Sequence, residues 1–206
     1  MRNANYWNTE GPQKVFTHPM CPEWLKEDLD RESSVLDLGC GYGRLTSDLR
    51  REGFRDIVGY DSSVPMIERA THENPGASYT SAINALADKS FDLVLCFALS
   101  TSCPSNDEHK ELAVFINSHT RENARLYISD YETADNPHCR DRYEQRELNT
   151  YGCFKSTTAV FRHHEPGHFD DLLPGWLKLK ERTLSSKTLH GHEITIHQYL
   201  YGKGMR

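Results

Sequence analysis

Short apolar stretches of strand length alternate with amphipathic stretches of helix length from residue 33 onward. Strands are predicted at residues 34–38, 56–60, 77–81, 91–97 and 125–129. Helices are predicted between them, at residues 43–52, 64–73 and 107–119. Alternation of this kind is typical of a doubly wound α/β fold, in which crossover helices cover a mostly parallel sheet.

The pattern changes after Asp130, where residues 131–153 are polar and carry little apolar periodicity. The pattern then predicts an extended segment near 157–164, a short helix near 169–173 and two extended runs, 177–184 and 193–201. His190-Gly191-His192 is expected in the turn between these two runs. We therefore expect seven strands in one domain, 1–206, closed by a C-terminal antiparallel hairpin. Residues 131–176 are expected to form a substrate-cap insertion, because ligands bind at the carboxyl ends of such strands.

Three glycines, Gly39, Gly41 and Gly43, follow the first predicted strand in VLDLGCGYGRL. Glycine suits a turn that needs positive φ or lets a ligand approach the main chain. A dinucleotide loop, G-x-G-x-x-G, would place its third glycine at position 44, which is arginine. Two acids sharpen the assignment to a nucleoside: Asp37 stands before the turn, and Asp61 ends the next strand, where it can accept hydrogen bonds from ribose hydroxyls.

Three segments in order resemble the class I S-adenosylmethionine-dependent methyltransferases: VLDLGCGYGRL, VGYDSSVPMIERA and SFDLVLCFAL. The resemblance covers roughly residues 33–130 and, less sharply, the N-terminal Tyr6-Trp7 and the C-terminal hairpin. It implies S-adenosyl-L-methionine as cofactor and S-adenosyl-L-homocysteine as product. It places backbone near Gly39 and Gly41 around the methionine part and Asp61 on the ribose. It also implies that Tyr6 and Trp7 close over the cofactor, that Ser62, Met66, Ala82 and Ile83 lie near the adenine, and that Cys96 and Phe97 offer backbone beside the sulfonium. Cys40 lies within the glycine turn, and the position of Asp37 allows its carboxylate either to support the turn or to reach a cationic group of the ligand.

Two departures from the family pattern stand out. Members often bind the adenine amino group with an acid after strand three, where this chain reads TSAIN, so Asn84 or a backbone carbonyl would have to substitute. Many members also carry a Gly-Gly turn before strand five, where this chain reads HTRENARLYIS. Asn123 tolerates positive φ better than most residues, so we expect that turn to persist.

The acceptor is expected beyond strands four and five. Tyr131 ends strand five, and His163 and His164 end the following extended segment, so these three are the candidate catalytic residues. Histidine titrates near neutral pH, as a general base should. The alternative is that these are surface or capping residues.

Composition limits the partners. The chain of 206 residues has a formal net charge of −6 and no dense Lys/Arg cluster, so nucleic acid is an unlikely partner. It shows no signal peptide and no apolar run long enough to span a membrane, which predicts a cytoplasmic protein with its six cysteines reduced. We expect no metal, because there is no C-x-x-C pair and His163 and His164 should point to opposite faces.

The sequence thus predicts an enzyme that transfers a methyl group from S-adenosylmethionine to an oxygen or nitrogen of a small-molecule metabolite, as a monomer or homodimer. Alternatives are a methyltransferase acting on a peptide or RNA, and a non-catalytic S-adenosylmethionine-binding protein. An NAD-dependent oxidoreductase is disfavoured by the glycine spacing. The identity of the acceptor does not follow from the sequence.

Overall fold

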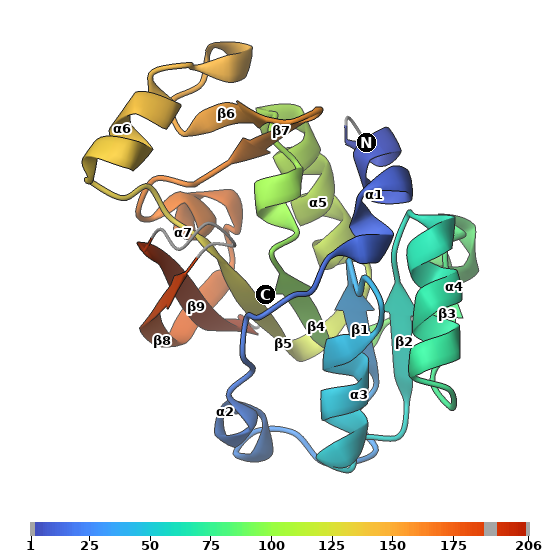
Figure 1. The fold of residues 1–206 in the computed structure, drawn as a ribbon. Helices are drawn as coiled ribbons and strands as arrows, with labels where there is room; N and C mark the ends of the chain where they lie inside the picture. Colours follow the sequence, from blue (N-terminus) through green and yellow to red (C-terminus); the bar gives the residue numbers. More distant parts are fainter. Residues whose placement is uncertain (1–2, 188–192, 205–206) are drawn as a thin grey trace.

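A seven-stranded sheet forms the centre of the molecule in the computed structural model, which describes residues 3–187 and 193–204. Its strand order is β3-β2-β1-β4-β5-β9-β8 (Figure 1). The strands are β1 (Val35–Leu38), β2 (Ile57–Tyr60), β3 (Ser78–Thr80), β4 (Phe91–Phe97), β5 (Thr120–Tyr131), β8 (Trp176–Lys187) and β9 (Glu193–Lys203).

The first five strands of this sheet run parallel, whereas β9 pairs antiparallel with β5 and β8 pairs antiparallel with β9. The predicted α/β sheet with a C-terminal antiparallel hairpin is confirmed. The predicted turn at His190-Gly191-His192 lies outside the described residues.

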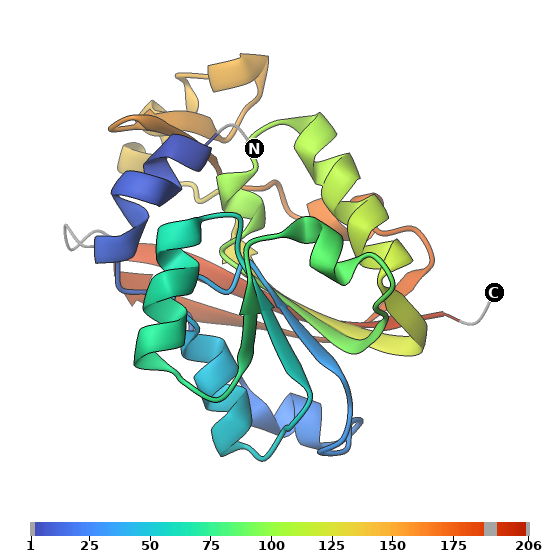
Figure 2. The ribbon, with the colours of Figure 1, turned by 90° about the vertical axis from the view of Figure 1, so that its right-hand side faces the viewer.

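Helices cover both faces of the sheet (Figure 2). They are α1 (Ala4–Thr9), α2 (Pro22–Lys26), α3 (Arg44–Arg51), α4 (Val64–Glu73), α5 (Asn106–Ser118), α6 (Pro137–Tyr143) and α7 (His168–Leu172), with 3-10 turns η1 (Gly11–Gln13), η2 (Ile83–Leu86), η3 (Ser100–Ser102) and η4 (Glu147–Asn149). Alternation along the strands separates two cores. Leu36 of β1 packs with α5, α7 and η2, whereas Val35 packs with α2 and α3.

Sequence periodicity missed the short N-terminal elements α1, η1 and α2, which span too few residues to show a repeat. It also predicted β5 too short at both ends, as residues 125–129, whereas the strand spans Thr120–Tyr131. Asn123 adopts φ 61°, as expected, and the strand continues through this irregular, mostly polar start.

Residues 131–164 rise beyond the carboxyl ends of the central strands (Figure 1). Here α6 packs on a two-stranded sheet, β6 (Cys153–Ser156) and β7 (Ala159–Arg162), around Cys139, Tyr143 and Phe154. Helix α7 instead contributes Phe169 to the main core. That the outer part serves as a substrate cap stays a prediction.

Candidate functional site

The glycine turn after β1 is built from left-handed backbone. Gly39, Gly41 and Gly43 have φ of 77°, 54° and 78°. The amides of Gly39 and Cys40 both donate to the carbonyl of Tyr60, at 2.8 and 2.9 Å, which fastens the turn to the end of β2. The turn therefore lies at the carboxyl edge of the sheet, where a parallel sheet binds its ligands.

Neighbouring side chains approach this turn closely. A Cβ on Gly39 would lie 2.9 Å from Leu99, and one on Gly43 would lie 2.5 Å from the Tyr79 hydroxyl. Glycine is thus needed here both for conformation and for space.

Asp61 follows β2 and turns its carboxylate toward the same turn. Its Oδ2 accepts a hydrogen bond from the Gly41 amide at 3.0 Å, and its Oδ1 accepts one from the Ser63 amide at 2.9 Å. Burial raises the pKa of Asp61, and these two amides oppose that shift. A half-buried carboxylate in this position can accept hydrogen bonds from the hydroxyls of a bound nucleoside.

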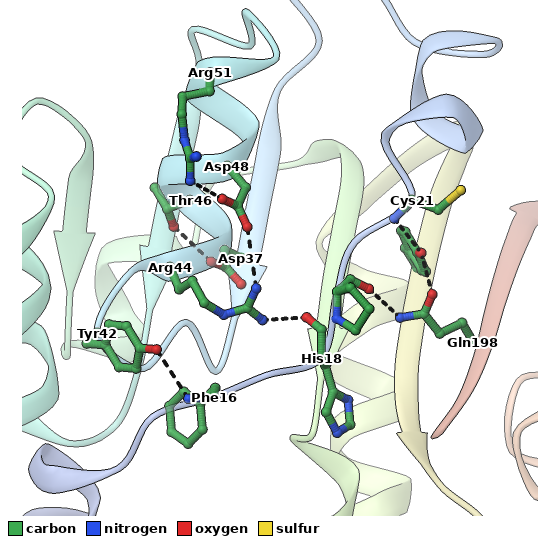
Figure 3. Close-up of polar contacts among 12 residues, drawn as sticks. Phe16, His18, Cys21, Asp37, Tyr42, Arg44, Thr46, Asp48, Arg51 and Gln198 are labelled. Atoms are coloured by element: carbon green, nitrogen blue, oxygen red, sulfur yellow. Dashed lines mark hydrogen bonds and ion pairs between the residues drawn. The ribbon is translucent and has the colours of Figure 1, made fainter. Parts of the chain in front are cut away.

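Asp37 of β1 lies beneath the turn and is 1% exposed. Thr46 of α3 donates its hydroxyl to Asp37 Oδ2 at 2.8 Å (Figure 3). Burial raises the pKa of Asp37 to about 6, and the negative charge of Asp61 adds to the shift. A buried and a half-buried carboxylate near one glycine turn suit a ligand that carries positive charge, as S-adenosylmethionine does at its sulfonium and amino groups. The residues present therefore fit this cofactor.

We expect Asp37→Asn to stabilise the free protein at neutral pH. Because the folded pKa of about 6 lies above the ordinary 3.8, ionising Asp37 costs stability as pH rises from about 4 to about 6. At neutral pH this cost lowers the free energy of unfolding of the wild type by about 2–3 kcal/mol relative to Asp37→Asn, and below pH 4 the cost is absent. Urea unfolding of wild type and variant at pH 4 and pH 7.5 measures it. The hydrogen bond from Thr46 and the charge of Arg44 partly oppose the raised pKa of Asp37. If the free energy of unfolding depended on pH equally in both proteins, the effect would not belong to Asp37.

The residues expected near the adenine differ in exposure. Met66 is buried, and its methyl lies 3.2 Å from the position of a Cβ on Gly41. Ser62 and Ala82 are exposed, and Ile83 is 48% exposed on η2 beside Asn84. An apolar side chain left open to solvent, as Ile83 is, fits contact with a flat aromatic ring. Contact of these residues with adenine stays a prediction.

At the end of β4, the side chains of Cys96 and Phe97 point into the two cores rather than toward a ligand. Their predicted contribution was backbone, which remains compatible with this placement. The next residue, Ala98, has φ 51°, and its amide donates to the Ser129 carbonyl at 2.8 Å. Backbone strain at a non-glycine residue clusters at functional sites. Nothing in the sequence signalled Ala98.

The N-terminal aromatics lie close to this edge of the sheet. The Trp7 carbonyl accepts a hydrogen bond from the Ser63 hydroxyl at 2.9 Å, which brings α1 near Asp61. Tyr6 is buried and packs edge-on against Phe161 of β7, with ring centroids 5.5 Å apart. Tyr6 and Trp7 therefore join the cofactor side to the outer part of the chain, and their closure over the cofactor stays a prediction.

Sequence reasoning missed the extended segment that follows, 14–21, which crosses the strand ends (Figure 3). Phe16 donates its amide to the Tyr42 hydroxyl, and its ring occupies the space beside Gly41. Arg44 donates to the His18 carbonyl at 2.6 Å, and Gln198 donates to the Pro19 carbonyl. The one available signal was Pro19, which disfavours helix at the residue before it.

His18, Tyr131 and His163 form a row of rings at the end of β5, where the acceptor is expected. Tyr131 lies edge-on to His18, with centroids 4.7 Å apart, and stacks on His163 at 5.2 Å. His18 Nδ1 shares a hydrogen bond with the Ser129 hydroxyl at 3.0 Å, while its buried Nε2 has no hydrogen-bond partner among the residues described. Burial lowers the pKa of His18 to about 4, so the ring is neutral at physiological pH.

The two neighbouring histidines point to different surroundings, as predicted. His163 is 4% exposed and bonds the Tyr143 hydroxyl at 2.7 Å through Nδ1, and burial lowers its pKa to about 3. His164 is fully buried near His109 and His168. So low a pKa makes His163 a weak base, and a catalytic role for either histidine stays a prediction.

A hollow of about 520 Å³ lies elsewhere, between the N-terminal segment and the outer side of α3. Its lining includes Met20, Arg44, Asp48 and Arg51, and none of the predicted cofactor residues. The geometry around Asp61, and not this hollow, carries the chemistry that suits a nucleoside.

A sheet of this order, with a glycine turn after β1 and an acid after β2, defines the class I methyltransferase fold, in which the cofactor is S-adenosylmethionine. The chain belongs to the methyltransferase domain family, whose model matches residues 18–173. The predicted family, enzyme class and cofactor are confirmed.

Sequence relatives include a ribosomal protein L11 methyltransferase from Cupriavidus taiwanensis, 32% identical over 120 residues. The match covers 55% of this chain and 38% of that protein. A second protein of the same description, from Paraburkholderia phytofirmans, is 34% identical over 91 residues, which are 41% of this chain and 30% of that one.

Solved structures confirm the fold. A methyltransferase dependent on S-adenosylmethionine from Methanosarcina mazei superimposes with a TM-score of 0.81 at 19% identity, covering 93% of this chain and all of that one. Magnesium protoporphyrin IX methyltransferase from Synechocystis, solved with S-adenosylhomocysteine, gives 0.69 at 15% identity, covering 98% and 97%. No helix among residues 3–187 and 193–204 has the length and apolar character to cross a membrane.

Proposed function

We propose that this methyltransferase methylates an oxygen or nitrogen of a small-molecule acceptor. S-adenosylmethionine supplies a methyl group already activated on a sulfonium, so the protein must chiefly hold the acceptor in line with it. Asp61 and the glycine turn bind and orient the nucleoside and methionine parts. Tyr131 and His18 position the acceptor at the end of β5.

The enclosure of the acceptor side carries this proposal. The Asn3 side chain donates to the carbonyls of Ser102 and Val160, at 3.0 and 2.6 Å, and accepts from the Val160 amide. One buried side chain thus joins α1, the turn after β4 and β7. An acceptor side covered by the chain's own segments favours a small molecule over a folded macromolecule.

Within this enclosure, the Nε2 atom of His18 is the best-placed recognition group. Leaving a buried polar atom without a hydrogen bond costs about 1–3 kcal/mol, and a hydroxyl or amine of the acceptor would remove that cost. The neutral ring can accept or donate at this atom, depending on its tautomer.

Methylation of a protein is the second candidate, favoured by the relatives described as ribosomal protein L11 methyltransferases. This chain spans less than half of their length, so the segments by which those proteins would bind L11 need not be shared. A methyltransferase acting on a peptide or RNA, and a protein that binds S-adenosylmethionine without catalysis, complete the set of candidates.

Transfer of label from methyl-labelled S-adenosylmethionine distinguishes these candidates. The enzyme is incubated in parallel with the dialysable metabolites of a cell extract, purified ribosomal protein L11 and total RNA. We expect label in the metabolites alone. Label in L11 or RNA would overturn the proposal, and binding without any transfer would favour a non-catalytic protein.

We expect His18→Ala to raise the KM for the acceptor at least about tenfold, because the variant loses a hydrogen bond in a buried site. The affinity for S-adenosylhomocysteine should stay within about twofold, since Asp61 and the glycine turn are untouched. Steady-state kinetics and calorimetry measure the two quantities. The exposed His72 on α4 gives a matched control, His72→Ala. An unchanged KM would remove His18 from the acceptor site.

A further inference from the structure

Three histidines that are distant in sequence meet beside the end of β5. His109 belongs to α5, His164 follows β7, and His168 begins α7. One ring nitrogen of each lies within 4.8 Å of the others. His164 is brought there because its amide donates to the Tyr131 carbonyl and its carbonyl accepts from Thr133, which extends the pairing of β5.

Hydrogen bonds fix the orientation of the first ring. His109 Nε2 lies 3.1 Å from the Ser100 carbonyl, which can only accept, so Nε2 carries the proton. His109 Nδ1 therefore has a lone pair, which accepts a hydrogen bond from His168 Nε2 at 2.7 Å. A metal ion would replace the proton between these two nitrogens. A metal-binding histidine usually has its other N–H held by a carbonyl or carboxylate in this way.

His164 is the unexplained member of the cluster. Its side chain is fully buried, yet neither Nδ1 nor Nε2 has a hydrogen-bond partner among the described residues. The nearest acid, Asp130, has Oδ1 3.9 Å from Nε2, beyond hydrogen-bond distance. A neutral imidazole always carries one N–H donor and one lone pair, so both are unsatisfied in this side chain. The ring stacks on His168, with centroids 5.0 Å and planes 11° apart, and is tilted 53° to the ring of His109.

We propose that His109, His164 and His168 bind one Zn²⁺ ion. In a tetrahedral site with Zn–N distances of about 2.0–2.1 Å, ligand nitrogens lie about 3.3 Å apart. Binding therefore requires the rings of His164 and His168 to turn out of their stacked arrangement, so that their nitrogens converge on the ion. Three imidazoles leave a fourth position for solvent, and the half-buried His168 provides the side from which the ion enters.

The surroundings both favour and oppose a cation. Burial lowers the pKa of His109 and of His168 to about 4, so both rings are in the neutral form that binds metal. The carboxyl of Asp130 favours a cation, whereas the guanidinium of Arg162 opposes one. The site ties α5 to the outer segment and α7, so Zn²⁺ also stabilises the fold.

The proposed zinc site revises the expectation of a metal-free protein, which rested only on residues close in sequence. The side chains of His163 and His164 lie in different surroundings, His163 beside Tyr143 and His164 beside His109 and His168. The partners of His164 come from α5 and α7, and spacing along the chain gives no sign of them.

Zinc titration of the full chain tests the site. His190 and His192, outside the described residues, are changed to asparagine in every protein so that they add no ligands. We expect one Zn²⁺ per chain by calorimetry and by elemental analysis after dialysis. Co²⁺ in place of Zn²⁺ should show the visible absorption of a four-coordinate site.

His168→Gln is the decisive variant, because its side chain is only half-buried and the fold should tolerate the change. Loss of a ligand should weaken Zn²⁺ binding at least about tenfold, since even losing a group that only orients a ligand costs about 10–100-fold. Zinc should raise the Tm of the parent and of His72→Gln, but not that of His168→Gln. Circular dichroism and S-adenosylhomocysteine binding verify folding. No stoichiometric Zn²⁺ in the parent, or unchanged binding in His168→Gln, would overturn the site.

Discussion

Asp61→Ala is expected to weaken S-adenosylmethionine binding by about 1–3 kcal/mol, or about 5–150-fold. The carboxylate is half-buried just after β2 and accepts hydrogen bonds from two backbone amides. Hydrogen bonds from ribose hydroxyls to an ionised acceptor are among the stronger ones in proteins. Isothermal titration with S-adenosylmethionine and S-adenosylhomocysteine measures the loss.

Two further variants separate the ribose contact from a general loss of structure. Asp61→Asn keeps an acceptor oxygen but no charge, so its affinity for S-adenosylmethionine should lie between those of the wild type and Asp61→Ala. Asp88 is exposed, and Asp88→Ala should bind as wild type does. Unchanged affinity in Asp61→Ala would show that the nucleoside binds elsewhere.

Gly43→Ala is expected to lower the free energy of unfolding by about 2–5 kcal/mol. Left-handed backbone costs an alanine about 1–2 kcal/mol, and displacing the Tyr79 ring adds a packing cost of about 1–3 kcal/mol. The φ of 78° and the 2.5 Å approach of the Tyr79 hydroxyl are the causes. Urea unfolding gives the value.

Gly175→Ala isolates the backbone part, because Gly175 has φ 90° and nothing within 4 Å of its Cβ position. It should lose about 1–2 kcal/mol. Combining Gly43→Ala with Tyr79→Phe removes the contacting hydroxyl and should recover part of the packing loss. If Gly43→Ala lost no more than Gly175→Ala, close packing at the turn would play no part.

Much of the central sheet could be predicted because its signals are local. Leu45 and Leu49 recur on one face of α3, and the strand residues 91–97 match β4 residue for residue. The positions of Gly39, Gly41 and Asp61 follow from the turn and from the end of the next strand. Local sequence therefore determined the cofactor side.

The acceptor side depends on contacts between distant segments, which no spacing reveals. Asn3 joins Ser102 and Val160, and His18 reaches Tyr131 only because segment 14–21 is held by Arg44 and Gln198. Burial also shifts the pKa of a side chain away from the value that its residue type suggests. His163 was predicted as a base from its ordinary pKa, but its surroundings lower that pKa to about 3.

A crystal structure with S-adenosylhomocysteine tests most directly the claim that the glycine turn and Asp61 hold the cofactor. We predict both ribose hydroxyls within about 2.6–3.2 Å of the Asp61 carboxylate oxygens, with the homocysteine part against Gly39 and Gly41. A nucleoside bound away from Asp61, for example in the hollow beside α3, would contradict it.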